Sequence, residues 1–106
     1  MMDQVVKTAE LAAIFSNELR LLIIAKLLEN PLIVNDIVEQ TGKPQAVISK
    51  QLGILKNAGI IKCCPDGRCR KYSLTDSAII KTILDSMENL KSKIASIANA
   101  DGQEGV

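Results

Sequence analysis

The sequence predicts a mainly α-helical domain that carries one small β-hairpin. Apolar residues recur every three or four positions over most of the 106 residues, which is the spacing of one face of an α-helix. Two short segments at 60–64 and 69–74 read instead as strands, and the strong hairpin signal Asp-Gly lies between them. Because 47% of the residues are hydrophobic, the chain can build a core, and we expect one domain over residues 1–100.

Two helices are expected in the N-terminal third, the first of them over Val5–Phe15. Ser16 and Asn17 then offer side-chain oxygens to the free amide groups at the start of the second helix. Pro31 disfavours helical geometry at Asn30, so the second helix should end there.

A short helix is expected over Val34–Gln40, closed by Gly42 in a left-handed conformation. Pro44 suits a first turn and opens a fourth, amphipathic helix. The expected buried stripe of that helix consists of Val47, Ile48, Leu52, Leu55 and Ala58. Its other face is polar, flexible or cationic and shows Gln45, Ser49, Lys50, Gly53 and Lys56.

The hairpin should follow Ala58-Gly59, with strands over Ile60–Cys64 and Cys69–Leu74. If Asp66-Gly67 is a two-residue turn, Cys64 faces Cys69. Successive residues of a strand project to opposite faces, so Cys63 would then face Arg70 on the other side of the hairpin.

The last helix is expected over Asp76–Ala98, and its apolar residues alternate steps of three and four across almost three heptads. Such a narrow seam suits a partner helix, so we expect this helix and the first one to pack on a second copy of the chain. A disordered tail is expected over residues 101–106. The expected interface comprises Val5, Ala9, Ala12, Ile80, Ile83, Met87, Leu90, Ile94 and Ile97.

Positive charge is concentrated on the fourth helix and the hairpin. The segment 43–71 holds seven cations and one anion, and its net charge of +6 exceeds the +1 of the whole chain. A basic helix beside a basic hairpin favours binding to a DNA duplex, with the helix in the major groove. The side chains expected to contact DNA are Lys43, Gln45, Ser49, Lys50, Lys56, Arg68, Arg70 and Lys71.

Several other classes of protein are excluded by what the sequence lacks. It has no histidine, the residue most used for proton transfer near neutral pH, and no Gly-rich phosphate loop, so we do not expect an enzyme. No apolar run is long enough to span a membrane, and the N-terminus lacks the basic region of a signal peptide. Three cysteines within seven residues suit reduced thiols, so we expect a cytoplasmic protein.

Four segments together resemble the ArsR/SmtB family of winged-helix repressors: Phe15–Arg20, Gln45–Leu52, Leu55–Ile61 and Asp66–Leu74. The resemblance covers about residues 5 to 98. It implies a winged helix-turn-helix of about five helices and a two-stranded wing, and a homodimer whose first and last helices form the interface. It also implies that the fourth helix reads a partly palindromic DNA operator, and that the protein leaves the operator when an inducer or oxidant arrives.

The signal is not identified by the resemblance. Family members often bind metal through Cys-x-Cys on the third helix or through Asp and His on the last helix, and their sulfur sensors place cysteines on the second and last helices. None of these three helices carries a cysteine and the chain has no histidine, so none of these sites is complete here; the only cysteines are Cys63, Cys64 and Cys69 in the wing. Three interpretations remain open. The cysteines are inert, or Cys64 and Cys69 form a reversible disulfide as a redox switch, or Cys64 and Cys69 bind a thiophilic metal or metalloid. The surrounding cations would favour the thiolate form.

Two other functions remain open at this point. One is a winged-helix module that binds a protein instead of DNA, which the +6 segment argues against. The other is a thiol-based redox or metal-binding protein without specific DNA binding.

Overall fold

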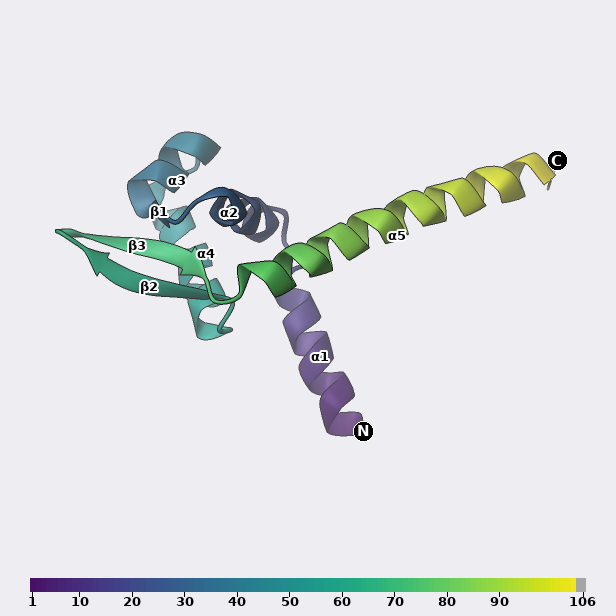
Figure 1. Cartoon of the computed structure of the whole chain (residues 1–106), viewed down its shortest axis with the longest axis horizontal. Helices are drawn as coiled ribbons and strands as arrows, with labels where there is room; N and C mark the ends of the chain where they lie inside the picture. Colours follow the sequence, from purple (N-terminus) through teal and green to yellow (C-terminus); the bar gives the residue numbers. More distant parts are fainter. Residues whose placement is uncertain (105–106) are drawn as a thin grey trace. The chain divides into compact units, whose positions relative to one another are not determined.

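The structure is a computed structural model that describes residues 1–104, and the side chains of residues 1–100 (Figure 1). The described chain divides into two compact units, one from Met1 to Thr75 and one that begins at Asp76. The first unit contains α1 (Met2–Ile14), α2 (Glu18–Glu29), β1 (Leu32–Ile33), α3 (Val34–Thr41), α4 (Gln45–Asn57), β2 (Ile61–Asp66) and β3 (Cys69–Leu74). The second consists of α5 (Ser77–Glu104). The five predicted helices are therefore confirmed.

The predicted helix ends are mostly confirmed by their caps. The Asn17 side chain accepts a hydrogen bond of 3.0 Å from the backbone amide of Arg20 at the start of α2. Gly42 closes α3 in the left-handed region, with φ +71°, a conformation that other residues rarely adopt. Pro44, with an extended ψ of 148°, is the N-cap residue of α4, so the first helical residue is Gln45. The tail predicted at 101–106 is helical through Glu104, and residues 105 and 106 lie outside the described residues.

The sheet contains the predicted hairpin and one additional strand. Its three strands are antiparallel in the order β1-β3-β2, and β1 pairs with β3 through Leu32 opposite Tyr72 and Ile33 opposite Lys71. Strand β1 was not predicted, because two residues are too few to show a periodic pattern. This strand attaches the start of α3 to the wing.

The predicted register of the hairpin is wrong. The turn consists of Gly67 and Arg68, so Cys64 faces Lys71, Cys69 faces Asp66 and Cys63 faces Tyr72. Gly67 has φ +63° and Arg68 does not have a positive φ, the combination that a type II′ turn requires. An Asp-Gly turn of type I′ would instead demand a positive φ from Asp66, which costs energy for a residue with a Cβ atom.

The core of the first unit is formed by aliphatic side chains from α2, α3, α4 and β2. The fully buried members are Ile23, Ile24, Ile37, Ile48, Leu52, Leu55 and Ile61. Two members of the predicted α4 stripe are not buried, since Val47 is 38% exposed and Ala58 is exposed. With about 100° of rotation per residue, Val47 cannot share the direction of its neighbour Ile48. The buried stripe of α4 is therefore narrower than the sequence predicted.

Arg20 joins the end of α1 to α4 within the first unit. Its Nε donates to the Ile14 carbonyl at 2.8 Å and its Nη2 donates to the Ala13 carbonyl at 3.3 Å. Its Nη1 donates to Oε1 of Gln51 in α4 at 3.0 Å. The guanidinium thus donates to carbonyl groups at the C-terminal end of α1, where a positive charge is also favourable.

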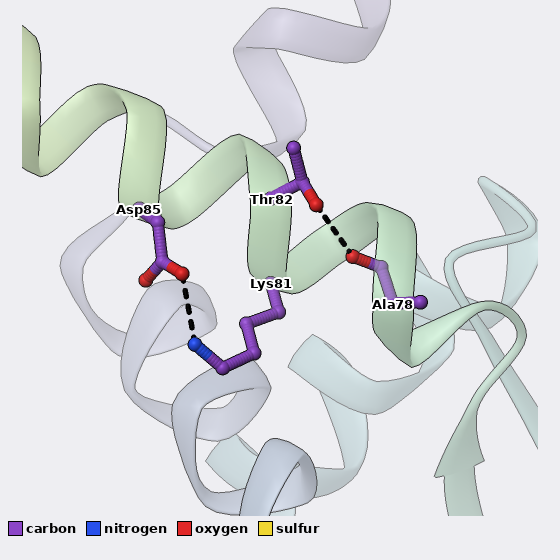
Figure 2. Close-up of polar contacts among 4 residues, drawn as sticks. All are labelled: Ala78, Lys81, Thr82 and Asp85. Atoms are coloured by element: carbon purple, nitrogen blue, oxygen red, sulfur yellow. Dashed lines mark hydrogen bonds and ion pairs between the residues drawn. The ribbon is translucent and has the colours of Figure 1, made fainter.

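The second unit, α5, is amphipathic and stabilises its own polar face. Lys81 pairs with Asp85 at 2.8 Å, and the Thr82 hydroxyl donates to the Ala78 carbonyl at 2.9 Å (Figure 2). A second ion pair joins Lys91 to Glu88 at 3.0 Å. The apolar residues Met87, Leu90, Ile94 and Ile97 are between 46% and 59% exposed. No helix among the described residues is long and apolar enough to cross a membrane.

We predict that Arg20→Met lowers the free energy of unfolding by about 1 to 3 kcal/mol, because three acceptors lose a charged donor. Urea denaturation monitored by circular dichroism would measure the change. Arg68→Met is the matched control, since Arg68 is exposed and forms no ion pair with a described residue. Equal midpoints for the parent and Arg20→Met would show that this contact does not contribute to stability.

Candidate nucleic-acid interface

The start of α4 presents polar and cationic side chains to solvent. Gln45, Ser49 and Lys50 are exposed in its first two turns, Lys43 is exposed just before it, and Lys56 is exposed near its end. None of the three lysines forms an ion pair with a described residue. Burial of Ile48, Leu52 and Leu55 fixes the rotation of α4 and turns Lys50 away from the core. The ammonium groups are thus free to meet an external anion.

A surface cavity of about 270 Å³ brings α4 and the wing together. Gln45 from the first turn of α4 and Arg70 from β3 both line it, so two residues predicted on separate elements lie at one site. Asn35, in the first turn of α3, also lines the cavity. It was not predicted, because the pairing of β1 with β3 that positions it has no signal in the sequence. The complete lining is Ile33, Val34, Asn35, Gln45, Cys69, Arg70 and Tyr72.

The cations of the wing do not all lie on one face. Arg70 and Lys71 are successive residues of β3, so their side chains project to opposite faces of the hairpin. Arg70 lies with Cys63, whose sulfur is 4.0 Å from its Nη1. Lys71 instead pairs with Asp66 at 3.6 Å and does not line the cavity. Arg68 occupies the turn itself and is exposed. The structure therefore joins Arg70, and not Lys71, to the α4 surface.

The three thiols are free, and two of them share a face of the wing. Cys64 pairs with Lys71, two residues beyond Cys69 in β3, so Cys64 and Cys69 are diagonal neighbours, for which Cα atoms are typically about 7 to 8 Å apart. That separation exceeds the usual Cα–Cα range of a disulfide. Cys64 and Cys69 are therefore not the direct cross-strand partners that were predicted, and a disulfide between them would require the backbone to move. Among the described residues, no three Cys, His, Asp or Glu side chains are grouped closely enough to hold a metal ion.

The environment of the wing raises the pKa of Tyr72. Burial raises its pKa above the ordinary value of 10.0, and the charge of Cys63 and a hydrogen bond with Cys63 raise the pKa further. Arg70 acts in the opposite direction because its positive charge favours the phenolate. Tyr72 also pairs with Leu32 of β1, so it connects β1, the wing and the cavity.

Comparison with known proteins gives a consistent result. Residues 17–62 match the family model described as "Bacterial regulatory protein, arsR family". An uncharacterised HTH-type transcriptional regulator of Methanocaldococcus jannaschii is 36% identical over 90 residues, which cover 84% of this chain and 100% of the relative.

Two solved structures have a similar fold. The transcriptional repressor BigR from Xylella fastidiosa gives a TM-score of 0.72 at 26% identity, over 86% of this chain and 92% of that one. Mb0332 from Mycobacterium bovis, described as a homodimeric winged helix-turn-helix DNA-binding domain, gives 0.68 at 21% identity, over 81% and 85% of the two chains. At that identity the second similarity concerns the fold alone.

We predict that Tyr72 ionises with a midpoint above pH 10.0 in the folded protein. Tyr72 is the only tyrosine of the chain and the chain has no tryptophan, so the absorbance of tyrosinate reports on this residue alone. Because the folded pKa is raised, the stability that Tyr72 contributes is fully present below pH 10.0 and is lost as the pH rises through the folded value. A spectrophotometric titration with and without urea measures both midpoints. Cys63→Ser should move the folded midpoint down, and identical midpoints in the folded and unfolded parent would contradict the prediction.

Proposed function

Because the chain belongs to the ArsR family of bacterial regulatory proteins, we propose that it is a homodimeric repressor that releases its DNA operator in response to a chemical signal. The family membership makes it a DNA-binding transcriptional regulator with a winged-helix fold and not an enzyme. The observation that best supports binding to an operator is the surface that the exposed start of α4 and Arg70 form around one cavity. An operator target places the protein in the cytoplasm.

The proposed mechanism is occlusion of the operator. The start of α4 enters the major groove, where Gln45 and Ser49 meet base edges; a glutamine amide suits adenine in particular. Lys43, Lys50 and Lys56 contact phosphates, which position the helix without reading the sequence. Arg68 and Arg70 reach the backbone or the minor groove from the wing. In a twofold dimer the two α4 helices lie about 34 Å apart, one turn of the duplex, so the operator is partly palindromic.

The homodimer is supported by apolar side chains that one chain leaves in water. In α1, all of whose residues are described, none is buried, and Val5 is 57% exposed. Val5, Ala9 and Ala12 line a surface hollow of about 460 Å³ on this helix. In α5, Leu90 and Ile94 are 59% and 56% exposed, so both helices offer stripes that a second copy would bury. Ile83 is half-buried and Ile80 is buried at 5%, so these two contribute less to the proposed interface. Sedimentation of the chain as a monomer at micromolar concentration would contradict the homodimer.

We propose the wing thiols as the site of the signal. Oxidation would remove two electrons and two protons from Cys64 and Cys69, form one S–S bond and break the O–O bond of hydrogen peroxide, which is reduced to two water molecules. Because these residues are diagonal neighbours, closing the bond would draw β2 and β3 out of their present register, and Arg70 lies next to Cys69 in the strand that moves. A thiophilic metal or metalloid held by the same two sulfur atoms would strain the wing in a similar way.

We predict that Lys50→Ala and Arg70→Ala each weaken DNA binding and reduce the slope of log affinity against log salt concentration by about 1, because each removes one phosphate contact. A duplex enriched from a random pool by the parent protein provides the ligand, and fluorescence anisotropy at several salt concentrations provides the measurement. Lys91→Ala is the matched control, since Lys91 lies in α5 and pairs with Glu88. If no duplex is enriched, or if both variants bind like the parent, the proposed DNA surface is wrong.

We predict that peroxide, arsenite or cadmium releases the parent protein from this duplex and that Cys64→Ser and Cys69→Ser each prevent the release. Cys63→Ser is the matched control, because Cys63 projects to the opposite face of the wing and should not affect release. Release is followed by fluorescence anisotropy, and oxidised thiols are counted by mass spectrometry. Unchanged release from the double variant would remove the wing thiols from the proposed function.

A further inference from the structure

Gly53 lies in the middle of α4, a 13-residue helix, and the fold itself gives no reason for a glycine there. Its φ is not positive, whereas Gly42, Gly59 and Gly67 have φ values of +71°, +81° and +63° that favour glycine. A Cβ atom built on Gly53 would meet no described atom within 4 Å. Glycine in a helix interior is less favourable than alanine because it loses more backbone entropy on folding. The missing side chain therefore lowers the stability of α4 without serving any contact within the chain.

The position of Gly53 indicates which external group benefits from the missing side chain. Gly53 is three residues from Lys50 and three residues from Lys56, so it lies between them on the surface of α4. Both lysines are exposed, and neither forms an ion pair with a described residue. The buried stripe of Ile48, Leu52 and Leu55 lies on the other side of the helix. Gly53 itself is half-buried, and this stretch of backbone without a side chain is flanked by two free ammonium groups, which favours a polyanion over an apolar partner.

We propose that the sugar–phosphate backbone of the operator makes its closest approach to α4 at Gly53, between phosphate contacts from Lys50 and Lys56. A glycine permits close approach of a ligand because no Cβ atom separates the helix backbone from it. With the ammonium groups on either side, the strand is held at two points and α4 lies deeper against the groove wall between them. This inference rests on the proposed DNA binding and adds a positioning residue that carries no charge and no hydrogen-bonding side chain.

The test is a pair of substitutions that should strengthen the fold while they weaken DNA binding. Gly53→Ala and Gly53→Met replace glycine by better helix formers, so both variants should melt higher than the parent, the Ala variant by about 4 °C. Against the enriched duplex, Gly53→Ala should bind about tenfold more weakly, since one added methyl group must be forced into a close contact. Gly53→Met should bind more weakly still. Ala25→Met is the matched control, because Ala25 is exposed on α2 and the same side chain there should leave DNA affinity unchanged.

Each outcome supports or overturns the proposal. A raised melting temperature together with weakened binding that grows from Ala to Met supports it, because a merely structural role would change stability and affinity in the same direction. Variants that melt higher and bind the duplex like the parent overturn it, and the proposed DNA binding then still stands on the parent. Loss of folding in both variants also overturns it, because Gly53 would then be required by contacts within the protein and not by DNA. A parent that binds no duplex ends the proposed function itself.

Discussion

The burial of Ile48, Leu52 and Leu55 is the constraint on which the rest of this structure depends. These three side chains are at most 1% exposed, and they pack α4 against the core formed with α2, α3 and β2. Because they fix the rotation of α4 about its axis, they also decide which residues point outward. Lys50 is turned to solvent as a consequence of aliphatic packing on the far side of the helix, whereas Gln45 is exposed because it lies in the first turn, before the buried stripe begins. The proposed reading of DNA is therefore positioned by the core and not by the polar side chains themselves.

Two further connections place the elements around α4. Arg20 donates to the carbonyl of Ile14 and to the side chain of Gln51, so the end of α1 is connected directly to the proposed recognition helix. The two-residue strand β1 pairs with β3 and brings the start of α3 beside the wing. Both connections are polar and short, and both join elements that are distant in sequence. The second connection also brings Ile33 and Asn35 to the cavity that Gln45 and Arg70 line.

The wing shows how strongly a single turn determines the chemistry of a hairpin. With Gly67 and Arg68 in the turn, Cys63 lies opposite Tyr72 and near Arg70, while Cys64 lies opposite Lys71. A turn one residue earlier would have made Cys64 and Cys69 direct partners. The choice follows from the positive φ that Gly67 accepts and Asp66 would resist. As a result, any bond between Cys64 and Cys69 would compete with the backbone geometry of the wing.

The sequence by itself determined the five helices, the hairpin and the family, because helical periodicity, caps such as Asn17 and Gly42, and the grouping of charge are local properties of the chain. It also placed the cations on α4 and the wing. Tertiary structure decided the register of the wing, the additional strand β1, the exposure of Val47 and the roles of Arg20 and Asn35. These features depend on contacts between residues far apart in the chain, and on a turn choice in which two adjacent dipeptides compete. Such differences in energy arise only when the elements are packed together, so a local pattern cannot reveal them.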